Sequence, residues 1–231
     1  MKILALDTAT ENCSAALLVD GEVTDQEALL QRAAAERILP MVDELLRSAG
    51  VSLAQLDAIA FGRGPGGFTG VRLAASITQG LAYAAGVPVV PVSDLRALAQ
   101  RALAAGGAAR VLACADARMS EVYWGSFAAD ASGEAQLLGT ERLGKPDAVQ
   151  LPAPWQAAAE VAGAGSGFAA HPQLGARLGL PVHSIRADLL PRALEIVRLA
   201  VAEVRAGRVL PAELAIPVYL RDDVARPAAS H

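Results

Sequence analysis

The fold is decided by a glycine-rich stretch, Gly62-Arg63-Gly64-Pro65-Gly66-Gly67-Phe68-Thr69-Gly70. An apolar run with the character of a buried strand, Leu56–Phe61, comes directly before it. A helical pattern that is apolar over a wide arc, Val71–Ala85, comes directly after it. Strand, glycine turn and helix in this order are typical of an α/β domain.

The same stretch contains the pattern G-x-G-x-x-G, as Gly62, Gly64 and Gly67, and Asp94 follows the next predicted strand. This arrangement would suit a dinucleotide-binding unit and leaves dinucleotide-dependent oxidoreduction as an alternative. Two features argue against it: Pro65 removes a backbone donor that a pyrophosphate would need, and three strands precede the loop. Asp94 also suits the N-cap of its own helix. No lysine follows the glycines, which excludes a P-loop.

Around this stretch the pattern predicts a complete α/β lobe. A helical stripe covers Ile38–Ala49, where Pro40 predicts either a late start or a kink. A strand at Val87–Val92 and a helix at Asp94–Leu103 follow the glycine stretch. Apolar runs predict three strands at the N-terminus: Lys2–Leu6, Cys13–Val19 and Glu22–Leu29. The predicted order is therefore β-β-β-α-β-α-β-α.

A small-residue segment, Ala104–Ala109, is the predicted linker to a second part of the chain. There the pattern predicts a helix at Leu189–Arg205. It also predicts four strands: Val111–Ala115, Val122–Phe127, Ala135–Leu143 and Glu160–Ala162. We therefore expect two lobes, residues 1–107 and residues 108–231, with the last helix and a tail in the second.

The composition of the 231 residues describes a globular chain with a small-residue core. Hydrophobic residues make up 53%, charged residues 19% and aromatic residues 4%. The formal net charge of −4 argues against a broad basic face, because phosphate contacts need clustered Lys and Arg. We therefore expect any nucleic acid to be held together with a partner.

Cysteine and histidine usage predicts neither a disulfide framework nor a metal centre. Cys13 and Cys114 are far apart in apolar runs, as expected for small buried side chains in a reducing cytoplasm. The apolar stretch Leu73–Ser93 is interrupted by glycine and proline, so we do not expect a membrane span. The three histidines lack the spacing of metal ligands: His171, His183 and His231.

A short polar turn, Asp7-Thr8-Ala9-Thr10, follows the first predicted strand. Asp7 could meet a magnesium ion through water, while the hydroxyls of Thr8 and Thr10 could donate to a phosphate. The same residue types favour hydrogen-bonded turns without any ligand. Both interpretations stay open on the residues alone.

The helix after the glycine stretch carries more apolar surface than one core contact needs. Eight apolar residues make up this arc: Val71, Leu73, Ala74, Ala75, Ile77, Leu81, Ala82 and Ala85. The helix is either enclosed within its own lobe, or one side of it meets a partner subunit.

Three segments together resemble the TsaB (YeaZ) family of tRNA threonylcarbamoyladenosine biosynthesis proteins. They are Asp7–Thr10, the glycine stretch continued to Arg72, and Pro217-Val218-Tyr219-Leu220-Arg221. The resemblance extends over almost the whole chain and implies a two-lobed actin-like ATPase (ASKHA, ribonuclease H-like) fold. Each lobe would be a mixed sheet with flanking helices, and the second lobe would be smaller and degenerate.

The resemblance implies a non-catalytic accessory subunit of a threonylcarbamoyltransferase complex. Such proteins pair with a TsaD-like catalytic paralogue and work with a TsaE-like ATPase. They support threonylcarbamoyl transfer to N6 of adenosine 37 in ANN-decoding tRNAs. Contact with tRNA would occur only through the complex, and the isolated chain would form a homodimer. No catalytic residue and no metal are implied.

The resemblance also implies a vestigial nucleotide site and an interface. The turn at Gly163 and Gly165 is similar to the adenosine-side glycine turn of the superfamily and would join Asp7, Thr8 and Thr10. No resident cofactor is implied, and ATP or ADP at the boundary with the partner is left open. We expect the partner on the two first-lobe helices, at Ile38, Val42, Leu45, Val71, Leu73, Ala74, Ile77 and Leu81.

The sequence differs from the usual family pattern at two places, and one alternative function stays open. The segment Arg32–Arg37 lacks a histidine that many relatives carry near it, and Gly67 stands where relatives often have serine. The alternative is a stand-alone actin-like ATPase or small-molecule kinase that acts through Asp7, Thr8, Thr10 and Gly163.

Overall fold

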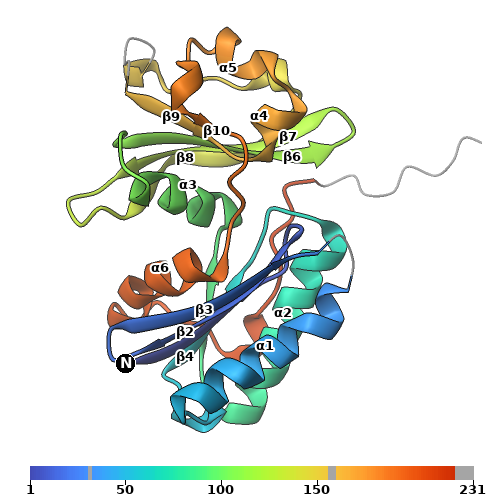
Figure 1. Ribbon diagram of the computed structural model, residues 1–231, viewed down its shortest axis with the longest axis vertical. Coiled ribbons are helices and arrows are strands. Elements are labelled where there is room, and N and C mark those ends of the chain that lie inside the picture. Colours follow the sequence, from blue (N-terminus) through green and yellow to red (C-terminus); the bar gives the residue numbers. More distant parts are fainter. Residues whose placement is uncertain (31–32, 156–159, 222–231) are drawn as a thin grey trace, which may run out of the picture.

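The computed structural model describes residues 1–30, 33–155 and 160–221. They form two five-stranded mixed sheets with helices packed on both faces of each, a two-lobed α/β fold (Figure 1). Five short 3-10 turns lie in the connections: Leu53–Gln55 (η1), Pro146–Ala148 (η2), Ala153–Trp155 (η3), Val182–Ser184 (η4) and Ala212–Leu214 (η5).

The first sheet contains five strands: β1 (Lys2–Asp7), β2 (Asn12–Val19), β3 (Glu22–Leu29), β4 (Ala58–Gly62) and β5 (Val89–Val92). Their spatial order is β3-β2-β1-β4-β5. β1, β2 and β3 form an antiparallel meander, and β4 and β5 add in parallel beside β1. The turn at Asp20-Gly21 has positive φ at both residues, as a tight hairpin with right-handed twist requires. The predicted strands of the first lobe are confirmed.

Side chains alternate between the two faces of this sheet and so determine which helices cover it. Leu4 and Leu6 of β1 belong to the core under α1 (Ala34–Ala49) and α2 (Phe68–Ala85). Ile3 and Ala5 belong to the opposite core, which is completed by α6 (Ala193–Arg205).

The second sheet contains β6 (Arg110–Arg118), β7 (Glu121–Ala129), β8 (Ala135–Gly144), β9 (Val161–Ala164) and β10 (Ile185–Arg186). Their spatial order is β10-β9-β6-β7-β8. One face packs on α3 (Asp94–Ala104) through Val111, Ala113 and Phe127. The other face packs on α4 (Ser166–Ala170) and α5 (Gln173–Arg177). The predicted strands of this region are confirmed, with boundaries shifted by one to three residues.

Two helices cross between the lobes. α3 comes from the first part of the chain but packs on the second sheet, and α6 comes from the last part but packs on the first. Both lie between the two sheets and contact each other (Figure 1). Placing the last helix in the second lobe was therefore wrong, because Ile196, Val197 and Leu199 bury their side chains against the first sheet. The division of the chain at residue 107 stays a prediction.

Two prolines show where helix prediction failed. α1 begins at Ala34 and continues through Pro40, so of the two predicted alternatives the late start was wrong, and the kink stays a prediction. Pro40 is exposed, so water can satisfy the carbonyl group that the missing N–H leaves free. α6 begins at Ala193 and not at Leu189, because Pro191 disfavours helical geometry at the residue before it.

Cys13 and Cys114 are buried, unpaired thiols, as predicted. Burial raises the pKa of Cys13 to about 11 and that of Cys114 to about 12, so both stay protonated and pack as small apolar groups. Among the helices of the described residues, none is both long and apolar enough to cross a bilayer.

Candidate functional site

The glycine stretch packs directly on the Asp7–Thr10 turn. The amide of Gly67 donates to the carbonyl oxygen of Ala9 at 2.7 Å, and Thr8 Oγ1 donates to the carbonyl oxygen of Gly70 at 2.7 Å. A Cβ added at Gly66 would lie 2.6 Å from the Ala9 oxygen, and one at Gly70 would overlap the carbonyl oxygen of Thr8. These glycines are therefore required by a close approach of two backbones within the protein itself.

Two buried carboxyl groups lie beneath this contact. A Cβ added at Gly62 would lie 2.5 Å from Asp94 Oδ1 and 2.7 Å from Asp7 Oδ1, so both side chains converge on this glycine. Asp7 Oδ1 accepts the amide of Ala9 at 2.7 Å, and Asp94 Oδ2 accepts the amide of Gly64. Asp7 and Asp94 therefore connect the ends of β1 and β4 to the start of α3.

Burial raises the pKa of both acids. The pKa of Asp7 rises to about 6, and the pKa of Asp94 rises well above its ordinary value because Asp94 is buried and faces the charge of Asp7. Burial beside Asp7 therefore favours the protonated form of the Asp94 carboxyl group. The N-cap assignment of Asp94 was wrong: Ser93 is the N-cap, its Oγ accepts the amide of Arg96, and Asp94 begins the helix.

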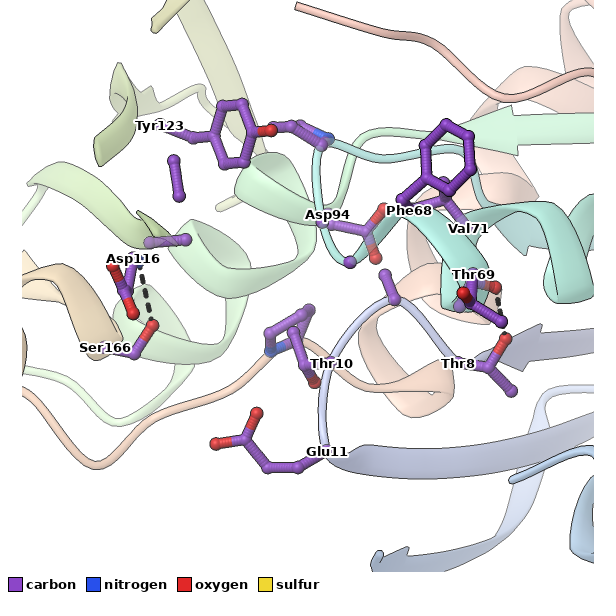
Figure 2. A pocket seen from close by; sticks show the side chains of 18 of the residues that line it. Thr8, Thr10, Glu11, Phe68, Thr69, Val71, Asp94, Asp116, Tyr123 and Ser166 are labelled. Carbon is purple, nitrogen blue, oxygen red and sulfur yellow. Dashed lines mark hydrogen bonds between the residues drawn. The ribbon is translucent and has the colours of Figure 1, made fainter. Parts of the chain in front are cut away.

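A cleft of about 1340 Å³ lies between the lobes. Thr8, Thr10 and Asp94 line it from the first-lobe side, and Asp116 and Ser166 line it from the second sheet and α4 (Figure 2). Ser166 Oγ accepts the amide of Asp116 at 3.0 Å. Asp7, although predicted as a nucleotide ligand, lies beneath the turn and not in the cleft wall.

Gly163 and Gly165 do not face the cleft. A Cβ at Gly163 would lie 2.7 Å from the ring of Phe168, and one at Gly165 would overlap the carbonyl oxygen of Cys114 and approach Leu98 at 2.6 Å. Neither glycine is among the cleft-lining residues. Their small size allows close packing of β9 and α4 against the second sheet. Their part in a nucleotide site stays a prediction.

Several polar groups that line the cleft are already bonded within the protein. The hydroxyl of Thr8 is already committed to Gly70. Both arginines among the described lining residues are ion-paired, Arg118 with Asp116 at 3.2 Å and Arg221 with Glu121 at 2.5 Å. Phosphate binding depends on donors and positive charge that are free to meet it. Within residues 1–30, 33–155 and 160–221, no three His, Cys, Asp or Glu side chains gather as metal ligands would.

Comparison with known proteins identifies the family. The family model described as TsaD: tRNA N6-adenosine threonylcarbamoyltransferase matches residues 23–229. The chain is 44% identical over 230 residues to the tRNA threonylcarbamoyladenosine biosynthesis protein TsaB of Escherichia coli (strain K12), covering 97% of this chain and 96% of that protein. The chain belongs to the TsaB family.

Other TsaB-family relatives agree. The protein of the same name from Haemophilus influenzae is 40% identical over 232 residues, covering 97% of this chain and 95% of that protein. The solved structure of YeaZ from Pseudomonas aeruginosa superposes with a TM-score of 0.86 at 46% identity, covering 95% of this chain and 99% of that one. The resemblance and the fold class inferred from the sequence are confirmed.

In this TsaB-family chain the predicted interface residues divide into two groups. Leu73, Ile77 and Leu81 of α2 are partly exposed. Five of the eight predicted side chains are buried in the first-lobe core: Ile38, Val42, Leu45, Val71 and Ala74. The apolar stripe of α1 was taken for an interface, but it packs on the sheet of its own lobe. A surface contact of α1 can only come from other side chains, such as the exposed Leu39.

One feature of this TsaB-family structure was missed from the sequence. The amide of Val218 donates to the carbonyl oxygen of Arg63 at 2.7 Å, and Arg72 Nε donates to the hydroxyl of Tyr219 at 2.5 Å. Arg221 reaches the carbonyl oxygen of Ala117 in the second lobe at 3.2 Å. The motif Pro217–Arg221, used above only for recognition, therefore joins both lobes at the cleft. Arg32 and the tail after Arg221 lie outside the described residues.

Proposed function

We propose that this chain takes part in tRNA threonylcarbamoyladenosine biosynthesis as a non-catalytic subunit. It binds a TsaD-like catalytic paralogue and, with a TsaE-like ATPase, supports threonylcarbamoyl transfer to N6 of adenosine 37 in ANN-decoding tRNAs. The names of the TsaB relatives support the pathway. In isolation the chain pairs with a second copy, and it meets tRNA only within the complex.

The observation that carries the non-catalytic role is the packing of the glycine stretch on Thr8 and Ala9. In an ATPase of this architecture the turn after the first strand would have to be free for phosphate. Here the backbone of Gly66 and Gly70 packs against Ala9 and Thr8, which covers one side of the turn, while Thr8 and Thr10 still line the cleft. A turn covered on one side and with the Thr8 hydroxyl bonded to Gly70 supports a role without nucleotide turnover.

The outer face of α2 supports partner binding. Leu73 and Ile77 are partly exposed on this face, and Gly80 follows Leu73 by two helical turns. Nothing lies within 4 Å of a Cβ added at Gly80. A glycine in the middle of an exposed helix costs about 0.5–1 kcal/mol relative to alanine. A glycine at this position would be useful if a partner helix packs closely against Gly80, and this supports α2 as a contact surface.

Reconstitution tests the proposal. The TsaD-family protein of the same organism, the TsaE-like ATPase, threonylcarbamoyl-adenylate and an ANN-decoding tRNA are combined with and without this chain, and modified adenosine is measured. We expect modification only when the chain is present. Full modification without it would contradict the proposal. Magnesium-dependent ATP turnover by the purified chain alone would favour the stand-alone ATPase or kinase instead.

A further inference from the structure

The segment Pro217–Arg221, here called the strap, crosses from the first lobe to the second (Figure 1). Its Val218 is bonded to Arg63 in the glycine stretch, and a Cβ at Gly64 would lie 2.9 Å from the Val218 carbonyl oxygen. Its Arg221 donates to Glu121 and Ala117 beside the β6–β7 turn. The strap is therefore fixed by hydrogen bonds at both ends.

Large apolar side chains are exposed along the strap and on the residues that it contacts. The exposed fractions are 45% for Phe68, 82% for Met119 and 41% for Tyr219. The rings of Phe68 and Tyr219 lie 6.0 Å apart, and Arg221 Nη1 lies 2.9 Å from the sulfur of Met119. All three side chains border the cleft between the lobes, and together they are here called the ridge.

A positively charged group is held rigidly in this ridge. The Arg72 guanidinium lies 3.6 Å from the centre of the Phe68 ring and 5.4 Å from that of Tyr219. Among the described residues, no carboxylate lies within ion-pair distance of Arg72. Stacking on two rings orders the guanidinium in advance, so little conformational entropy is lost when an acid binds to it. Arg72 is therefore suited to pair with a carboxylate of a binding partner.

The β6–β7 turn beside the strap has unusual backbone geometry. Arg118, Met119 and Ser120 are three consecutive residues with positive φ, at 62°, 54° and 57°. Each such residue costs on the order of 1 kcal/mol and persists only where its surroundings impose it. Here Arg221 bonds the turn on both sides, to Ala117 and Glu121. This strained turn leaves the apolar side chain of Met119 in solvent.

We propose that the ridge is a protein-docking surface. Its occupant is an apolar surface of the catalytic partner that places an Asp or Glu side chain against Arg72; the identity of that partner rests on the function proposed above. Exposed aromatic and arginine side chains are the types that dominate binding energy at protein interfaces. RNA is disfavoured, because three carboxylates line the same cleft that the ridge borders: Glu11, Glu36 and Asp116. The partner then contacts both lobes and not only α2.

The test compares variants of the full chain in titration calorimetry against the TsaD-family protein of the same organism. Met119→Asp and Arg72→Gln should each weaken binding by about tenfold or more. Val182→Asp is the matched control, since Val182 is 88% exposed on the second lobe and away from the ridge. It should bind like the unmodified chain. Met119 and Arg72 are both exposed, so thermal unfolding of each variant should match that of the unmodified chain.

The outcomes separate this inference from the proposed function. If the unmodified chain does not bind the TsaD-family protein, the proposed function fails. If the unmodified chain binds and both ridge variants bind equally well, only the ridge inference is overturned. It is also overturned if the ridge variants keep their partner affinity but lose cross-linking to tRNA, because the surface would then be an RNA site.

Discussion

Asp7 and Asp94 meet beneath Gly62, one at the end of the first strand and the other at the start of the helix that crosses to the second lobe. Each also accepts a backbone amide, from Ala9 and Gly64 respectively. The pair therefore connects the turn, the glycine stretch and α3. Because the glycine stretch packs on that turn, the carboxyl pair also supports the surface to which the strap is bonded.

The stability of the chain should depend on pH through this pair. Both pKa values are raised above the unfolded value near 4, to about 6 for Asp7, so the folded state keeps protons that the unfolded chain has released. Stability is then fully present below pH 4 and is lost as pH rises through the folded pKa values. Asp94→Asn keeps an acceptor for the amide of Gly64 but does not titrate.

Chemical denaturation between pH 5 and pH 7 measures this effect. The free energy of unfolding should fall as the pH rises, and it should fall more steeply in the unmodified chain than in Asp94→Asn. We expect the two slopes to differ by on the order of 1 kcal/mol per pH unit. Asp25→Asn, on the exposed strand β3, is the control and should leave the slope unchanged. Parallel slopes for Asp94→Asn and the unmodified chain would show that Asp94 does not hold the extra proton.

Two glycines of α2 should respond to alanine in opposite ways. Gly70→Ala places a Cβ on the Thr8 carbonyl oxygen and should destabilise the fold by about 3 kcal/mol, as overpacking does. Gly80→Ala meets nothing within 4 Å and should stabilise the free chain by about 0.5–1 kcal/mol. Urea denaturation of both variants gives the two values. Equal effects would contradict the close backbone approach at Gly70.

The sequence predicts local structure well because its apolar periodicity is local. Periodicity does not say which sheet a helix covers. The apolar stripe of α6 was predicted from the sequence, but the helix was assigned to the second lobe, whereas Ile196 and Leu199 pack on the first sheet. An apolar stripe also has the same pattern whether it faces a core or a partner, and so the buried Ile38 was assigned to the interface. The contact of Arg72 with Tyr219 joins positions 147 residues apart, beyond the reach of any local pattern.

Partner binding through α2 should be lost on charge insertion at its exposed face. Leu73→Asp places a carboxylate on a partly exposed position, so it should lower affinity for the TsaD-family protein by about tenfold or more while thermal unfolding changes little. Ile38→Asp is the contrasting variant: its side chain is fully buried, so it should unfold the chain. A complex that survives Leu73→Asp combined with Ile77→Asp would remove α2 from the interface.

A buried glutamate should fix the second sheet against the glycine stretch. The β7–β8 register shifts between Trp124 and Ser126, and Gly139 has a φ of 83°, as expected for a bulge in β8. The bulge lies beside Glu141, whose carboxylate accepts hydrogen bonds from Arg63, at 3.3 Å, and from Ser93. Its side chain is only 6% exposed, so solvent screens this ion pair weakly.

Glu141→Ala would therefore leave two donors without their acceptor, which costs about 1–3 kcal/mol when the groups stay buried. We expect faster amide hydrogen exchange at Gly64 and Val218, because both depend on the position of Arg63. Glu141→Gln keeps an oxygen for one donor and should fall between the unmodified chain and the alanine variant. Glu134→Ala, also on a second-lobe glutamate but paired with Arg96, is the control. If both alanine variants accelerate exchange at these two amides equally, the effect comes from general loosening and not from the contact of Glu141 with Arg63.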